Sequence, residues 1–161
     1  MPPLNRCIEL FSARKLPIFA TRDWHPANHC SFVAQGGPWP PHCVAGTRGA
    51  EFAPTLYMPP HLPIVKINKG HDPAKDAYSG FEGTDLDQHL KQLGVKRLFV
   101  GGLATDYCVL NTVLDGLKLG YQVIVLRDAI RAVDVTPGDG DRALAEMTGK
   151  GASLAETGAL S

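Results

Sequence analysis

The sequence has no excess of charge of either sign and no long hydrophobic run. Its 16 basic and 16 acidic residues cancel, so no electrostatic feature favours binding to nucleic acid or to an anionic membrane. None of the apolar stretches approaches the ~20 residues of a membrane-spanning helix. The first residues also lack the charged start and the apolar core of a signal peptide. These absences argue against a nucleic-acid-binding or membrane protein and favour a cytoplasmic location.

Cysteine is scarce, and its spacing excludes the common cysteine-rich sites. The four cysteines, Cys7, Cys30, Cys43 and Cys108, show no close-paired metal or redox spacing. Without an export signal they are expected to be reduced thiols. The 161 residues match the length of one domain, which we expect to span residues 1–161.

Helical and strand patterns alternate along the chain, which is typical of an α/β fold. Helices are expected near 4–14, 84–93, 106–118 and 141–147, and strands near 16–21, 64–67, 98–100, 122–126 and, more weakly, 152–154. The stretch from 22 to 63 is long, proline-rich and irregular, which in a small domain indicates a functional segment. We therefore predict a parallel open sheet with helices on both faces.

The stretch 97–118 lies at the centre of this pattern. A short apolar strand ends at Gly101 and Gly102, and Thr105 occupies the position of a helix N-cap. Cys108 would then lie in the first helical turn, where backbone N–H groups and the helix dipole favour the thiolate over the thiol. Cys108 is therefore a candidate nucleophile at the carboxyl edge of the sheet. The alternative is a small, buried apolar residue.

Asp23, His25 and His42 form a candidate metal site. Residues two apart in an extended segment point to the same side, so Asp23 and His25 can bind one ion, and His42 can complete the set. Two imidazoles and one carboxylate suit zinc, iron or manganese. His29 is either a further ligand or a support for the ligands. The alternative is a chance D-x-H pattern in a loop.

Lys69 follows the end of another expected strand. The strand ends near 21–23, 67–69 and 101–104 should share one edge of a parallel sheet. An ammonium group at that edge would favour the thiolate of Cys108. The alternative is a solvated surface charge.

Four stretches together resemble motifs of the nicotinamidases in the isochorismatase-like cysteine hydrolase superfamily. They are A-T-R-D-W-H-P-A-N-H (20–29), G-G-P-W-P-P-H-C (36–43), Lys69 followed by A-Y-S-G-F-E-G-T-D-L (77–86), and G-G-L-A-T-D-Y-C-V (101–109). The resemblance covers residues 4 to about 147 in the family's order and spacing. It implies that a small amide, nicotinamide, is hydrolysed to nicotinic acid and ammonia through a cysteine thioester, as a step of NAD salvage.

The resemblance also assigns roles to residues. It implies Cys108 as the nucleophile, Lys69 as its cationic partner, and Asp23, His25 and His42 as ligands of one divalent metal, zinc before iron or manganese. It implies a cis peptide bond between Leu103 and Ala104, which helps to direct backbone N–H groups near Ala104 and Cys108 towards the substrate oxygen. Trp39 is expected to form the wall on which the pyridine ring stacks.

The start of the sequence departs from the family's pattern. The family's triad includes an aspartate at the end of a strand before the first helix, whereas this chain begins at that helix and no aspartate precedes Asp23. We therefore expect an N-terminally truncated fold in which the neighbours of that strand keep unpaired edges. Two interpretations follow: a nicotinamidase with an incomplete start, or a catalytically impaired paralogue or fragment that binds metal or pyridine ligands without turnover. Both interpretations are compatible with a homo-oligomer.

Overall fold

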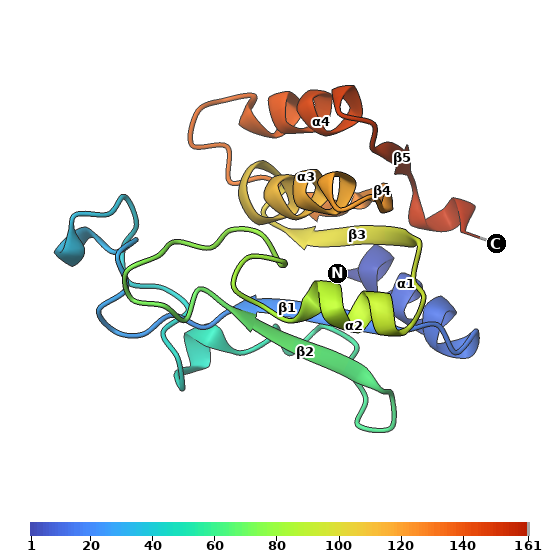
Figure 1. Ribbon diagram of the computed structural model, residues 1–161, viewed down its shortest axis with the longest axis horizontal. Helices are drawn as coiled ribbons and strands as arrows, with labels where there is room; N and C mark the ends of the chain where they lie inside the picture. Colours follow the sequence, from blue (N-terminus) through green and yellow to red (C-terminus); the bar gives the residue numbers. More distant parts are fainter. Residues whose placement is uncertain (161) are drawn as a thin grey trace.

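Helices and strands alternate in the computed structural model, which describes residues 1–160 (Figure 1). The helices are α1 (Pro2–Ala13), α2 (Leu86–Gln92), α3 (Leu110–Lys118) and α4 (Asp139–Gly149). The strands are β1 (Ile18–Asp23), β2 (Ile64–Lys69), β3 (Arg97–Leu103), β4 (Gln122–Arg131) and β5 (Ser153–Ala155). A π-helical turn, Thr105–Val109, joins β3 to α3. Every predicted helix and strand is present, with its ends shifted by a few residues.

The strands pair only in parallel, and they form two separate ladders. β1 pairs with β2, while β4 lies between β3 and β5. Among residues 1–160, β1 pairs only with β2 and β3 only with β4, so each keeps an unpaired edge.

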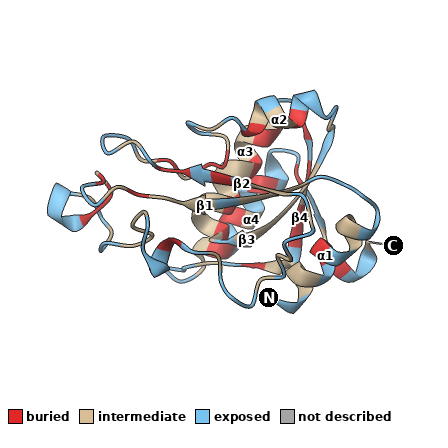
Figure 2. Ribbon diagram, turned by 90° about the horizontal axis from the view of Figure 1, so that it is seen from below, coloured by how far each residue is buried: buried red, intermediate tan, exposed pale blue. Residues whose placement is uncertain are grey.

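Helices cover both faces of this sheet layer, which confirms the predicted fold class. α1 lies on one side and α2 and α3 lie on the other (Figure 2). On the α1 side, Phe11 packs edge-on against Phe99 of β3, with ring centroids 5.3 Å apart. On the other side α2, α3 and α4 share one core with β2 and β4, in which Val113, Val125 and Met147 are completely buried. This core holds the ends of β2 and β3 in place below the candidate site.

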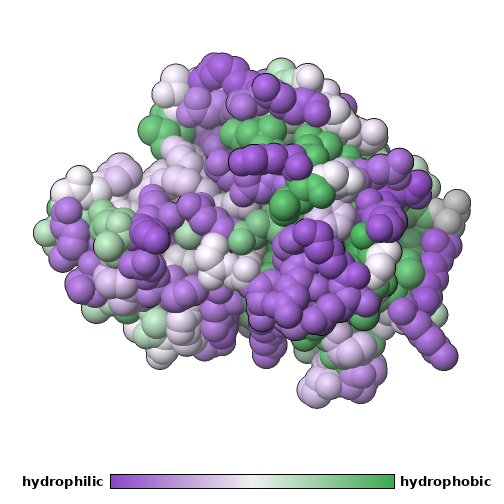
Figure 3. Space-filling model, viewed as in Figure 1, coloured by the Kyte–Doolittle hydropathy of each residue, from purple (hydrophilic) through white to green (hydrophobic). Residues whose placement is uncertain are grey.

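The surface is polar around a narrow apolar strip. In the view of Figure 3, hydrophobic side chains gather around α3, between the hydrophilic outer faces of α4 and α2. Leu114 and Leu117 line a shallow hollow there together with Lys118 and Lys150. No helix within residues 1–160 combines the length and the apolar character that crossing a membrane requires.

Candidate active site

The carboxyl ends of β1, β2 and β3 bring the predicted site residues to one edge of the sheet. Asp23 ends β1 and Lys69 ends β2, and the two residues are partners in the parallel register. β3 leads into the turn that carries Cys108, and Lys69 Nζ lies 3.4 Å from Cys108 Sγ. The prediction that these strand ends meet is therefore confirmed by the geometry.

The turn that carries Cys108 differs from the expected helix start. It is π-helical from Thr105 to Val109, and its N-cap position is Ala104, not Thr105. The Ala104 carbonyl accepts the N–H groups of Tyr107 at 3.2 Å and Val109 at 2.9 Å. The prediction of Thr105 as N-cap is wrong, because the chain is already helical at that residue and its side chain is buried.

The two residues before the turn match the expectation drawn from the resemblance. The Leu103–Ala104 peptide bond is cis. The Ala104 backbone lowers the pKa of the Cys108 thiol and so favours the thiolate. The Leu103 side chain is 71% exposed, so only its backbone can contribute to the site.

Burial controls the ionisation of Cys108 more strongly than the expected helix effect. Desolvation raises the pKa of the Cys108 thiol above its ordinary value, and the Lys69 ammonium and the Ala104 N–H oppose this only in part. The prediction that the helix start makes Cys108 a ready thiolate is therefore wrong. Burial is the largest of the influences on this pKa, because it penalises the charged thiolate.

Lys69 is buried, and all three of its N–H donors are engaged. Its Nζ donates to the Asp23 carboxylate, to the Ala77 carbonyl at 2.9 Å and to Cys108 Sγ at 3.4 Å. Burial pushes the pKa of Lys69 down, but the negative charges of Cys108 and Asp23 outweigh burial and raise it. Lys69 is therefore a fixed cation between a carboxylate and the thiol.

Asp23, His25 and His42 lie together, as predicted, with one ligand atom of each within 4.8 Å of the others. The Nδ1–H of His25 donates to the Gly70 carbonyl at 2.8 Å, and that of His42 donates to the Pro40 carbonyl at 2.9 Å. These bonds fix the ring orientations and leave Nε2 of each ring as the ligand atom. The donor set of two imidazoles and one carboxylate suits a divalent transition metal.

His29 supports this group and is not part of it. Its ring stacks on that of His25, with centroids 4.1 Å apart. Its Nδ1 accepts from the Ser31 hydroxyl at 2.8 Å, and its Nε2–H donates to the Lys75 carbonyl at 3.1 Å. Because both ring nitrogens have hydrogen-bond partners, neither is free to bind a metal. His29 therefore supports the ligand residues, which is the second of the two roles expected for it.

Three aromatic side chains form a cluster at the turn that carries Cys108. The Trp39 indole N–H donates to the Tyr78 hydroxyl at 3.0 Å, and both rings lie against Tyr107, at centroid distances of 5.1 and 5.5 Å. Sequence reasoning selected only Trp39. Tyr78 and Tyr107 lay inside the quoted motifs, and aromatic character next to Lys69 and Cys108 was the signal that could have identified them. Together they form an aromatic cluster that offers ring edges and faces for contact with another flat ring.

Known proteins resemble this chain in sequence and in fold. Residues 1–159 match the isochorismatase domain family. The nicotinamidase of Escherichia coli is 39% identical over 171 aligned residues, which cover 93% of this chain and 79% of that protein. The crystal structure of the Pyrococcus horikoshii pyrazinamidase in complex with zinc has a TM-score of 0.89 and 48% identity, covering 96% of this chain and 83% of that one.

A second solved structure carries a pyridine ligand. The structure of PnC1 from L. infantum in complex with nicotinate has a TM-score of 0.81 and 36% identity. The superposition covers 95% of this chain and 80% of that chain. The similarity to both solved structures therefore extends over nearly the whole of this chain.

Proposed function

The chain belongs to the isochorismatase family, and we propose that it is a nicotinamidase that hydrolyses nicotinamide to nicotinic acid and ammonia. The observation that carries the proposal is the contact of Lys69 with Cys108 on one side and with Asp23 of the metal group on the other. This contact places a candidate nucleophile, a cation and a ring-positioning group within one small site. The proposed step would supply nicotinic acid to NAD salvage.

Cys108 is the proposed nucleophile. Its thiolate attacks the carboxamide carbon, and the backbone N–H groups of Ala104 and Cys108 stabilise the oxyanion of the tetrahedral intermediate. The π-helical turn supports this role because the Ala104 carbonyl accepts from Tyr107 and Val109 and not from Cys108. The turn therefore does not use the Cys108 N–H in the bond that an α-helical turn would form there.

Lys69 is the proposed proton carrier. Its ammonium lies 3.4 Å from the sulfur and stabilises the thiolate. An amide bound at this sulfur would place its departing nitrogen close to the same ammonium. After it protonates that nitrogen, ammonia leaves and a thioester remains. Water then attacks the thioester, its proton returns to Lys69, and nicotinic acid and the thiolate are released.

The metal and the aromatic residues are proposed to orient the ring. Asp23, His25 and His42 would hold one divalent ion, with zinc preferred because the P. horikoshii relative binds it. Such an ion supplies a binding point for the pyridine nitrogen, directly or through water. Trp39, Tyr78 and Tyr107 hold the ring plane by stacking. Orientation of the amide against Cys108 follows from these two constraints.

A second candidate function is binding of metal and pyridine ligands without turnover. It is favoured by one observation: within residues 1–160, Asp23 is the carboxylate that hydrogen-bonds Lys69, and Asp23 is also a proposed metal ligand. An additional base for the thiol proton is not evident in the described part of the site. Ammonia release by the purified protein separates the two functions.

The test is Cys108→Ala with Cys30→Ala as the matched control. Cys30 is half-buried in the loop between His25 and His42, so it is a thiol of similar exposure outside the contact with Lys69. We expect Cys108→Ala to abolish ammonia release from nicotinamide with little change in zinc content, and Cys30→Ala to retain activity. Ammonia release by Cys108→Ala at the wild-type rate would refute the nucleophile. Zinc-dependent nicotinamide binding without any wild-type turnover would support the second function.

A further inference from the structure

The turn that holds Cys108 is wound one residue wider than an α-helix. In an α-helical turn the Ala104 carbonyl would accept the N–H of Cys108, four residues later. It accepts the N–H of Val109 at 2.9 Å, five residues later. Such turns are rare and occur frequently at functional sites. A change to α-helical winding would rotate Cys108 relative to Lys69.

Asp106 connects this turn to residues 132–135, a segment that lies far from it in the sequence. Its Oδ1 accepts the backbone N–H of Val133 at 3.0 Å, and its Oδ2 accepts that of Asp134 at 2.9 Å. A first-turn carboxylate commonly caps N–H groups of its own helix. Here both oxygens are used by residues 27 and 28 positions later in the chain.

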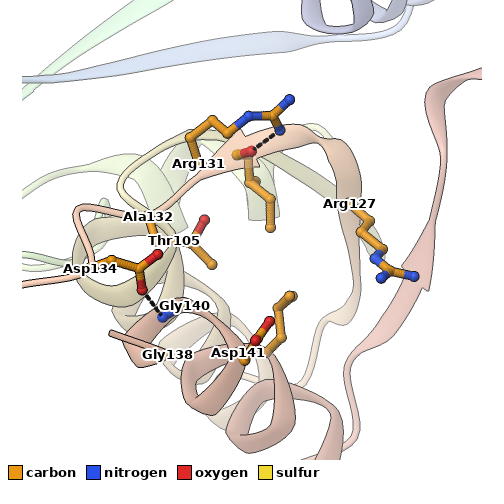
Figure 4. Close-up of a pocket in the computed structure, with 10 residues that line it drawn as sticks. Thr105, Arg127, Arg131, Ala132, Asp134, Gly138, Gly140 and Asp141 are labelled. Carbon is orange, nitrogen blue, oxygen red and sulfur yellow. Dashed lines mark hydrogen bonds between the residues drawn. The ribbon is translucent and has the colours of Figure 1, made fainter. Parts of the chain in front are cut away.

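Hydrogen bonds, more than packing, hold this segment against the turn. Val133 and Val135 are 51% and 64% exposed, so neither side chain anchors the segment in the core. A hollow of about 270 Å³, lined by Thr105, Asp134 and Gly140, lies behind it (Figure 4). The two bonds from Asp106 therefore carry the connection.

The segment is in turn fixed to the start of α4. Asp134 has a φ of +54°, in the left-handed region. Its Oδ1 accepts the N–H of Gly140 at 2.8 Å, the dashed line between these two labelled residues in Figure 4. A Cβ on Gly140 would lie 2.7 Å from that of Ala132, so α4 and the segment approach as closely as a glycine allows. The support for the turn thus extends from Asp106 through Asp134 to α4.

We propose that Asp106 is a positioning residue that holds the turn Thr105–Val109 in its π-helical winding and so places Cys108 against Lys69. This role rests on the proposed function, because it concerns the nucleophile of that reaction. Asp106 touches neither substrate nor sulfur in this scheme. It acts by binding the two N–H groups of Val133 and Asp134, which the core-packed α4 holds in place through Gly140.

The test is Asp106→Asn, with Asp141→Asn as the matched control. Asparagine keeps the size of the side chain but offers only one acceptor oxygen, so one of the two N–H groups loses its partner. Asp141 is an exposed acid on the neighbouring α4, and no hydrogen bond or ion pair ties its side chain to the rest of residues 1–160. We measure kcat and KM for nicotinamide, zinc affinity, and hydrogen exchange of peptides covering 104–109 and 132–135.

We expect Asp106→Asn to lower kcat about 10- to 100-fold, since a displacement of ~1 Å at the reacting atoms can cost that much. Zinc affinity should change less than about twofold because no metal ligand lies on this turn. Exchange should rise in both peptides, while Asp141→Asn should match the wild type. A kcat within twofold of wild type at a temperature where Asp106→Asn is folded would overturn the proposal.

Two further outcomes are also decisive. If Asp106→Asn does not fold, Asp134→Gly, which removes the acceptor of the Gly140 N–H and suits the positive φ at this position, must lower kcat in the same way, and an unchanged kcat there overturns the proposal. If the wild type releases no ammonia, the proposed function fails and hydrogen exchange decides alone. Faster exchange at 104–109 in Asp106→Asn, but not in Asp141→Asn, then supports the positioning role, and equal exchange overturns it.

Discussion

Replacing Lys69 by methionine tests whether the buried ammonium supports both the fold and the chemistry. Lys69 is 3% exposed, and the Asp23 side chain keeps 22% exposure. Removing one partner of a buried ion pair typically costs about 3–5 kcal/mol. Because Asp23 can still reach water and methionine restores apolar packing, we expect a loss near the lower end, about 3 kcal/mol. For a chain of this length that corresponds to a fall in Tm of roughly 6–12 °C.

The same substitution should remove the proposed proton carrier. Loss of acid–base assistance typically lowers a rate by about 10²–10⁴-fold, so ammonia release should fall within that range. Thermal unfolding and ammonia release are measured for Lys69→Met and for Lys66→Met, an exposed lysine on the same strand. Lys66→Met should behave as the wild type in both assays. A Lys69→Met protein with wild-type Tm and rate would show that the ion pair has neither role.

Two other substitutions test the metal group and the alkaline stability. Gly70→Ala should weaken zinc binding, measured by chelator competition, because the new Cβ would lie 2.5 Å from His25 Cε1. The control Gly83→Ala has a similar φ of +66° and nothing within 4 Å of the new Cβ, so it should bind zinc normally. Equal zinc affinity in the two variants would contradict this prediction. Burial and the hydrogen bond to Asp87 raise the pKa of Tyr121 from 10.0 to about 12. The tyrosine therefore loses its proton at a lower pH in the unfolded state than in the folded state. The free energy of unfolding should fall as the pH rises between these two values. In Tyr121→Phe this fall should be smaller in urea unfolding, and an identical fall would contradict the assignment.

The order and type of the elements followed from sequence pattern, but the strand ends did not. β1 was expected to stop near Thr21 because Arg22 and Asp23 are polar, yet the ladder with β2 continues to the Asp23 and Lys69 pair. β4 likewise continues through Asp128 to Arg131. Main-chain hydrogen bonding to a parallel neighbour does not depend on side-chain polarity, so hydropathy alone marks these ends too early.

The candidate site was predictable in its members and less so in its electrostatics. Local motifs identified Cys108, Lys69 and the metal group, since strand ends of a parallel sheet converge. The raised pKa of Cys108 could not be predicted from the turn, because burial by distant segments causes it. The anchoring of Asp106 by Val133 and Asp134 was also hidden, since a separation of 27 residues leaves no periodic signal.

The position of Asp23 links the two halves of the site. One oxygen accepts from Lys69, while the other lies 3.9 Å from His25 Nε2. The negative charge of Asp23 raises the pKa of Cys108, and the charge of Lys69 lowers it. A cation held by Asp23 would weaken the effect of Asp23 on the pKa of Cys108 and leave the effect of Lys69, which would favour the thiolate. The three ligands would then do more than orient a ring, because filling their site would also offset part of the cost that burial imposes on the nucleophile.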